Sequence, residues 1–92
     1  MIKSFADEET QRVYMTGRSR KLGRIARVAA RRINAIDFAA ALEDLRSPPG
    51  NRLEKLHGER EGYYSIRVND QYRVCFRWEG KDAWEVGLVD YH

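Results

Sequence analysis

The chain has 92 residues, of which 42% are hydrophobic and 34% charged, and its formal net charge is +3. A chain of this length can build one modest core, so we predict a single domain over residues 1–92. It contains no run of about 18 apolar residues, and acids follow the first few residues, so the sequence predicts neither a membrane span nor a secretion signal and favours the cytoplasm. The single cysteine, Cys75, excludes an internal disulfide and a cysteine zinc site.

The first half of the chain has helical patterns. Acids followed by Thr16-Gly17 predict a short helix over residues 7–15. Asp37 is expected to cap a later short helix that continues to Leu45 and ends at Pro48-Pro49. We expect Phe38, Leu42 and Leu45 to face the core there. Between these two helices lies the clearest helical period of the chain, whose apolar face is Leu22, Ile25, Ala29, Ile33 and Ile36.

The same central helix carries arginines opposite its apolar face. No acid occurs between Thr10 and Ile36. Like charges three or four residues apart repel by a few tenths of a kcal/mol. A solvated helix face is one interpretation, but the absence of any carboxylate favours a phosphate-bearing or acidic partner. A DNA-reading helix is a weaker alternative, because the stretch offers no Asn or Gln for base contacts after the first arginine until Asn34. The aligned arginines are Arg20, Arg24, Arg27 and Arg31.

The second half predicts an antiparallel sheet. A weak strand over residues 53–56 and a charged loop over residues 57–62 precede a meander of three strands, over residues 63–68, 72–78 and 83–91. The residues around Lys3 can add an edge strand. With the helices packed on one face of this sheet, the fold class is α+β.

Alternation along the strands sorts their side chains onto two faces. The apolar face, which must pack on the helices, consists of Tyr64, Ile66, Val68, Tyr72, Val74, Phe76, Trp78, Trp84, Val86 and Leu88. The open face consists of Tyr63, Ser65, Arg67, Arg73, Cys75, Arg77, Glu85, Gly87, Val89 and Tyr91.

A turn at Asn69-Asp70 places Arg67 directly across from Arg73. Like charges in that position destabilise a sheet, so we expect an anionic group to lie over the pair. The next turn pairs Arg73 with Gly87 or Val89, and either register brings Tyr91 to the same face. The alternative is that these are ordinary outward residues and that the chain end is frayed; a slip of one residue would reverse the faces.

This residue set suits RNA cleavage without a metal or cofactor. The 2′-hydroxyl attacks the adjacent phosphorus, which requires a base, a cation and an acid for the leaving oxygen. Arg73 fits the cation, and His92 fits an acid or a base near neutral pH. Tyr91 can stack on a base or position the attacking oxygen. RNA-binding sheets that do not cut can carry the same residue types.

The segment NRLEKLHGEREGYYSIRVNDQYRVCFRW and the ending VDYH resemble the HigB-type toxins of the RelE superfamily, which are plasmid-maintenance killer proteins of type II toxin-antitoxin pairs. The preceding LEDLRSPPGNRLE also matches that family. The resemblance implies a RelE-like fold, with N-terminal helices on one face of a small antiparallel sheet. It implies an endoribonuclease that cleaves messenger RNA in the ribosomal A site, inhibits translation and is neutralised by a HigA-type antitoxin. The antitoxin is expected to carry the complex to operator DNA.

The resemblance also assigns site residues. His57 lies where related toxins often have lysine, and some relatives place a histidine where this chain has Glu54. A non-catalytic RNA-binding or regulatory module of the same fold is the alternative; growth arrest relieved by the neighbouring gene's product would favour the toxin. The catalytic candidates are Arg73, Asp90, Tyr91, His92 and His57. The candidates for contacting RNA or the ribosome are Arg20, Arg24, Arg27, Arg31, Lys55, Arg60 and Arg67.

Overall fold

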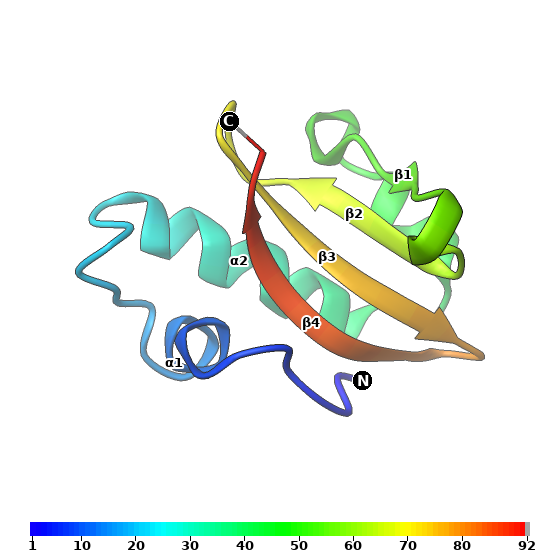
Figure 1. Ribbon diagram of the computed structural model, residues 1–92, viewed down its shortest axis with the longest axis horizontal. Helices are drawn as coiled ribbons and strands as arrows, with labels where there is room; N and C mark the ends of the chain where they lie inside the picture. The colour runs from blue at the N-terminus through cyan, green and yellow to red at the C-terminus, as the bar shows by residue number, and fades with distance from the viewer. Residues whose placement is uncertain (92) are drawn as a thin grey trace.

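The computed structural model describes residues 1–91, so the predicted role of His92 lies outside the described residues. Within residues 1–91, no helix has the length and apolarity needed to cross a membrane. Helices α1 and α2 cover one face of a four-stranded antiparallel sheet with strand order β1-β2-β3-β4 (Figure 1). The predicted α+β fold is therefore confirmed. The elements are α1 (Glu8–Thr16), α2 (Ile25–Phe38), the 3₁₀ helices η1 (Leu42–Arg46), η2 (Pro49–Asn51) and η3 (Gly58–Arg60), and strands β1 (Glu54–Lys55), β2 (Tyr63–Arg67), β3 (Tyr72–Glu79) and β4 (Asp82–Asp90).

The signals at the ends of α1 act as expected. The Asp7 carboxylate accepts a hydrogen bond from the Thr10 backbone N–H at 2.7 Å, which satisfies a donor that the helix itself cannot pair. Gly17 ends the helix in the left-handed conformation, with φ 69°, and its N–H donates to the Val13 carbonyl at 2.8 Å.

Helix α2 places its predicted apolar face in the core. Leu22, which precedes the helix, is also buried, and Ile25 is half-buried. Because α2 begins only at Ile25, Arg20 and Arg24 lie in the turns before it rather than on the helix. The fully buried side chains of α2 are Ala26, Ala29, Ile33 and Ile36.

The predicted third helix is wrong in its start and in one core residue. Asp37 lies within α2, where its carboxylate accepts hydrogen bonds from the Ile2 backbone N–H at 2.8 Å and from the Tyr14 hydroxyl at 3.0 Å. Asp37 therefore ties the N-terminal segment and α1 to α2 instead of capping a new helix. Phe38, expected in the core, is 83% exposed. In place of the predicted helix, the segment up to Arg46 forms the 3₁₀ helix η1, which buries Leu45.

The sheet register agrees with the sequence at its central pairs. Arg67 is the Cα partner of Arg73, and Arg73 pairs with Val89, one of the two predicted registers. The expected edge segment near Lys3 also forms, as short parallel bridges along β4. In one of them the Lys3 backbone N–H donates to the Ala83 carbonyl at 2.7 Å.

A β-bulge in β4 corrects the predicted position of Trp84. Cys75 pairs with Gly87 while Arg77 pairs with Trp84, so β4 contains one extra residue between these pairs. Glu85 occupies the irregular position with φ 53°. Since a bulge shifts the alternation by one residue, Ala83 is buried in place of the tryptophan, and Trp84 lies on the open face with its ring 5.4 Å from Arg77 Cζ.

Candidate active site

The floor of the candidate site consists of small residues on the central strands. Ser65 on β2 and Cys75 on β3 are direct Cα partners, and both are buried although they face away from the helices. On the other side of Cys75, its partner Gly87 has no side chain. A Cβ there would lie only 2.9 Å from the Cβ of Ala6, so glycine allows the N-terminal segment to approach β4 closely.

Arg73 is the most firmly held charge at this site. Its Nε donates to the Ser65 hydroxyl at 2.8 Å, and its Nη2 donates to the carbonyls of Arg52 at 2.5 Å and Ser65 at 3.2 Å. The same Nη2 lies 3.3 Å from a carboxylate oxygen of Glu54 on β1. The Arg73 side chain is only 11% exposed. These contacts fix the orientation of the guanidinium and use Nε and Nη2, which leaves Nη1 for an incoming oxygen.

Tyr91 lies beside this guanidinium, as predicted from the strand alternation. Its backbone N–H donates to the Gln71 carbonyl at 2.7 Å, which holds the C-terminal segment against the β2–β3 turn (Figure 1). Its ring centroid is 6.0 Å from Arg73 Cζ, and its hydroxyl contacts Cys75 Sγ at 3.6 Å. The chain end is therefore tied to the sheet as far as Tyr91.

The environment of Tyr91 favours the protonated phenol. Burial raises its pKa most, and the hydrogen bond with Cys75 raises it further, while the charges of Arg60 and Arg73 act in the opposite direction. The residue as a whole is 46% exposed, yet its hydroxyl is directed at the buried Cys75, which explains why burial dominates. Tyr91 is therefore a neutral hydrogen-bonding group at physiological pH.

The expected repulsion between Arg67 and Arg73 is present, but carboxylates of the chain itself offset it. Glu54 pairs with Arg73, and Asp70 in the β2–β3 turn pairs with Arg67. An external anion is thus not required for the fold. Together with neighbouring residues these groups surround an open depression of about 270 Å³, lined by Arg52, Glu54, Arg67, Asn69, Asp70, Arg73 and Tyr91.

The charged loop contributes Arg60 to the surroundings of this depression. The Arg60 guanidinium lies 5.6 Å from the Tyr63 ring centroid, and its charge lowers the pKa of Tyr91. Lys55 and His57 are exposed. Among the hydrogen bonds and ion pairs within residues 1–91, none joins His57 to Arg73 or Tyr91. The structure thus brings Arg60 toward the site more clearly than His57.

Asp90 lies on the other side of the sheet from Tyr91. It pairs with Tyr72 and accepts a hydrogen bond from the Gln71 side-chain amide at 3.1 Å. It also lines a small cavity of about 190 Å³ with residues of α1 such as Thr10, and with the preceding Asp7. The structure therefore does not place the Asp90 carboxylate beside Arg73.

Sequence reasoning missed three groups that hold Arg73. The register of β1 pairs Glu54 with Ser65, so a correct register for this weak strand would have predicted Glu54 beside Arg73. Ser65 was assigned to the correct face but given no partner. The third group is the carbonyl of Arg52, a residue in the left-handed conformation with φ 46°. No residue pattern in this segment predicts that conformation.

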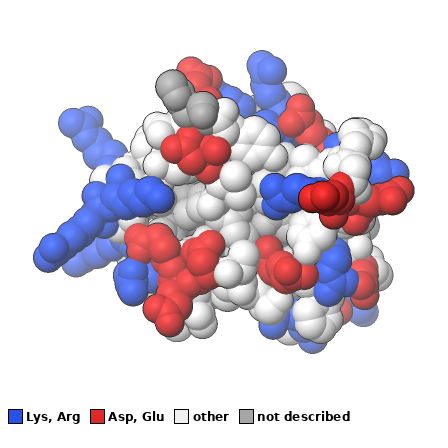
Figure 2. All heavy atoms as spheres, in the orientation of Figure 1, with Lys and Arg blue, Asp and Glu red and all other residues white. Residues whose placement is uncertain are grey.

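A second basic surface lies where α1 connects to α2. It is a hollow of about 610 Å³, here called the arginine basin. Three of the four arginines predicted to align line it: Arg20 and Arg24, which precede α2, and Arg27, which lies on α2. Arg31 is exposed further along α2. Positive side chains project from this end of the molecule, whereas both signs are mixed elsewhere on the face shown in Figure 2. The lining residues are Gly17, Arg18, Ser19, Arg20, Gly23, Arg24 and Arg27.

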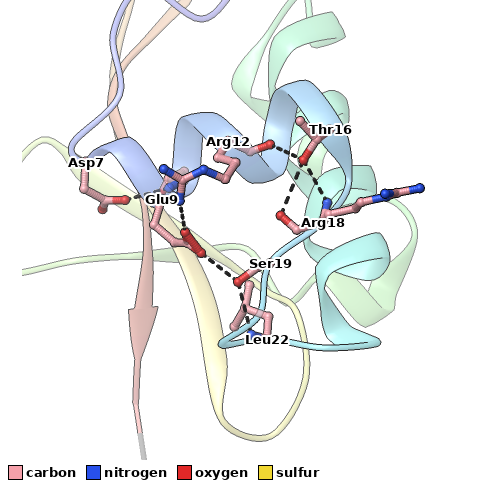
Figure 3. A network of polar contacts seen from close by, with 8 residues as sticks. Asp7, Glu9, Arg12, Thr16, Arg18, Ser19 and Leu22 are labelled. Carbon is pink, nitrogen blue, oxygen red and sulfur yellow. Dashed lines mark hydrogen bonds and ion pairs between the residues drawn. The ribbon is translucent and has the colours of Figure 1, made fainter.

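A polar network fixes the backbone that carries the arginine basin (Figure 3). The Ser19 hydroxyl donates to Glu9 at 2.7 Å and accepts from the Leu22 backbone N–H at 3.1 Å. The Thr16 hydroxyl accepts from the Arg18 backbone N–H at 3.1 Å. None of the ion pairs within residues 1–91 uses an arginine of the basin. The connection is therefore ordered while its cationic groups remain available to a partner.

Comparison with known proteins identifies the same family along nearly the whole chain. A family model for the RelE-like toxin of the type II toxin-antitoxin system HigB matches residues 3–92. The chain is 40% identical over 80 residues to Toxin HigB-1 of Vibrio cholerae, covering 85% of this chain and 84% of that protein. It is 38% identical over 64 residues to Endoribonuclease HigB of Proteus vulgaris, covering 66% of this chain and 65% of that protein.

Two solved structures share the fold. The YoeB-YefM complex from Staphylococcus aureus contains a chain that matches with a TM-score of 0.56 and 17% identity, covering 100% of this chain and 98% of that one. The YoeB/ParE toxin from Agrobacterium tumefaciens matches with a TM-score of 0.53 and 19% identity, with 98% coverage of both chains. The sheet and helices, together with the family match over residues 3–92, show that this chain belongs to the HigB family of RelE-like toxins of type II toxin-antitoxin systems.

Proposed function

We propose that this toxin is a metal-free endoribonuclease that cleaves messenger RNA in the ribosomal A site. The observation that carries the proposal is the fixed Arg73 guanidinium, 11% exposed and 6.0 Å from the Tyr91 ring, at the edge of an open depression. A cation that is oriented before the substrate arrives is the arrangement expected for stabilising a transition state that gains negative charge. The name of the Proteus vulgaris relative, an endoribonuclease, supports the same activity.

In the proposed reaction, the 2′-oxygen attacks the adjacent phosphorus and the bond to the 5′-oxygen breaks. The products are a 2′,3′-cyclic phosphate and a 5′-hydroxyl. Arg73 stabilises the added negative charge at phosphorus through its fixed donors. Tyr91 orients the nucleotide by stacking or by a hydrogen bond. Its neutral phenol suits this role, since a phenolate would repel the phosphate.

We assign the two proton transfers to Glu54 and to His92. The Glu54 carboxylate lies 3.3 Å from Arg73 Nη2 and is the described carboxylate in contact with the guanidinium, so it is placed to accept the proton of the 2′-hydroxyl. His92 follows Tyr91 in the chain, and an imidazole can protonate the leaving oxygen near neutral pH. Asp90 is assigned no direct proton transfer, because it pairs with Tyr72 on the face of the sheet opposite Arg73. His57 is assigned none because no hydrogen bond or ion pair within residues 1–91 joins it to the groups that hold Arg73.

In this proposal the ribosome orients the RNA, which the depression alone does not do. The depression is open and small, so it offers few contacts to orient a flexible RNA by itself. We propose that the arginine basin binds phosphates of ribosomal RNA, and that Arg31, Lys55, Arg60 and Arg67 add to this attraction. Such a protein would act in the cytoplasm, where a HigA-type antitoxin would neutralise it and carry the complex to operator DNA.

A non-catalytic RNA-binding module is the second candidate. The observation that favours it is the engagement of Arg73 by Glu54, which places a carboxylate where a substrate phosphate would approach. Such a protein would bind RNA through its basic surfaces without breaking a phosphodiester bond.

Mapping RNA ends on programmed ribosomes tests the proposal. Purified toxin should produce 5′-hydroxyl ends at the A-site codon, with no cleavage of the same RNA without ribosomes. Deleting Tyr91 and His92 should abolish cleavage while antitoxin binding survives, since the buried residues of β4 end before them. Ribosome binding without any new RNA ends would establish the second candidate instead.

A further inference from the structure

Tyr91 is attached to the sheet at two points with different consequences. Its backbone N–H bonds to the Gln71 carbonyl, which fixes the main chain just after β4 ends at Asp90. A main-chain bond does not select the side-chain rotamer. At the side chain, the Tyr91 hydroxyl contacts Cys75 Sγ at 3.6 Å, and the ring lies beside the Arg73 guanidinium on the open face. The ring of a residue that is 46% exposed would otherwise have several staggered directions available.

Cys75 lies in a position that suits this task. Its neighbours along β3, Val74 and Phe76, are fully buried on the helix side, so the Cys75 thiol faces the open side. The residue is nevertheless 2% exposed, and its partner Gly87 has no side chain, because Ala6 of the N-terminal segment packs where a Gly87 Cβ would lie. A thiol and a tyrosine hydroxyl at this distance can form a weak hydrogen bond in which either group is the donor.

The neighbouring strand repeats this arrangement for Arg73. Ser65, the direct Cα partner of Cys75, accepts a hydrogen bond from Arg73 Nε at 2.8 Å. Two paired floor residues on β2 and β3 therefore hold the two side chains above them. Because the strand pairing fixes the floor atoms relative to each other, it also fixes the Tyr91 ring relative to the guanidinium, at 6.0 Å from ring centroid to Cζ.

We propose that Cys75 is a positioning residue for RNA cleavage: its thiol holds the Tyr91 hydroxyl and thereby keeps the Tyr91 ring beside the Arg73 guanidinium. This inference rests on the proposed function and concerns the same site. It gives the single cysteine of the chain a role beyond filling space in the sheet. The raised pKa of Tyr91 is consistent with it, since a protonated phenol can share its hydrogen with the sulfur.

Substitutions at Cys75 separate positioning from packing. Cys75→Ala removes the thiol and should lower kcat for cleavage of ribosome-bound RNA about tenfold, the size expected for one hydrogen bond, with little change in KM. Cys75→Ser keeps a hydroxyl that can donate to or accept from Tyr91 and should restore most of the missing activity. Val13→Ala, which truncates a buried residue of α1, is the matched control: it should lower the melting temperature without lowering kcat.

A double-mutant cycle with Tyr91→Phe gives the decisive readout. If Cys75 acts through the phenol, Cys75→Ala should have no further effect on kcat in the Tyr91→Phe background. A reduction that is equal in both backgrounds would overturn the proposal and leave Cys75 as a packing residue. Wild-type kcat in Cys75→Ala would overturn it as well. Failure of the proposed function is a separate result, because the wild-type protein itself would then bind ribosomes and cut no RNA.

Discussion

Arg73 and the arginines of the arginine basin differ in how the chain holds them. Arg73 is 11% exposed and bonds to Ser65, Arg52 and Glu54. The basin arginines project from an ordered connection between α1 and α2, and no ion pair within residues 1–91 uses them. A charge fixed in a partly buried site suits transition-state stabilisation, whereas exposed charges suit reversible, salt-sensitive binding to phosphates. The two surfaces thus indicate a division between chemistry and docking.

The largest expected effect follows from removing the fixed charge. Arg73→Ala should lower the rate of RNA cleavage about a hundred- to a thousandfold, the cost typical of removing one stabiliser of transition-state charge. The side chain lies on the open face, so the protein should still fold and bind its antitoxin. The measurement is the single-turnover rate on programmed ribosomes.

Arg73→Lys is the matched control for this prediction. It keeps the charge but not the planar set of donors that bonds Ser65 and Arg52, so cleavage should recover only in part. Full activity of Arg73→Ala would remove Arg73 from the chemistry and make the two arginine surfaces equivalent.

Reversing the charge of the basin should act on binding instead. The triple variant Arg20→Glu, Arg24→Glu and Arg27→Glu should weaken ribosome affinity, and each phosphate that the variant no longer binds should reduce the slope of log affinity against log salt by about 0.7 to 0.9. Thermal stability should change little, because these side chains are exposed. Unchanged ribosome affinity, with reduced antitoxin affinity, would reassign the basin to the antitoxin.

A smaller effect is expected from loosening the helix that leads into the basin. The Tyr14 hydroxyl donates to Asp37 at 3.0 Å and joins α1 to α2, so Tyr14→Phe should lower the free energy of unfolding by about 1 kcal/mol. The hydrogen bond to Asp37 raises the pKa of Tyr14, so this stabilisation should be complete below the unfolded pKa of about 10 and disappear as pH rises through the folded value. Denaturant unfolding at neutral and alkaline pH measures the difference, and a constant gap between the two proteins above pH 10 would contradict it.

The smallest effect is expected at a position that lines neither surface. Phe38 is 83% exposed at the end of α2, so Phe38→Ser should change the free energy of unfolding by less than about 0.5 kcal/mol and leave cleavage intact. A destabilisation of several kcal/mol in urea unfolding would show that Phe38 belongs to the core after all. Phe38→Leu, which keeps an apolar side chain, is its control.

The sequence predicted the parts of the fold that depend on local chemistry and simple periodicity. Asp7 and Gly17 bound α1 because capping groups act within one turn of the helix. The pairing of Arg67 with Arg73 follows from the short turn between β2 and β3. Tyr91 on the open face follows from alternation counted from Arg73, since the pairing with Val89 is regular near that end of the sheet.

The failures have long-range causes. Asp37 looked like a helix cap, but the backbone N–H of Ile2 and the Tyr14 hydroxyl occupy its carboxylate, and neither is near it in sequence. Trp84 was predicted in the core because simple alternation does not reveal the bulge at Glu85, which moves Trp84 to the open face. The contact of Glu54 with Arg73 required the register of a two-residue strand, which a weak pattern does not determine.

The division between chemistry and docking is tested most directly by one measurement: the single-turnover cleavage rate as a function of ribosome concentration, for the wild type, Arg73→Ala and the triple basin variant. We expect Arg73→Ala to lower the limiting rate and keep the ribosome concentration that gives half of that rate. The basin variant should raise that concentration, most strongly at low salt, and keep the limiting rate. If both variants change the same parameter in the same way, the two arginine surfaces have the same function and the proposed division between chemistry and docking is wrong.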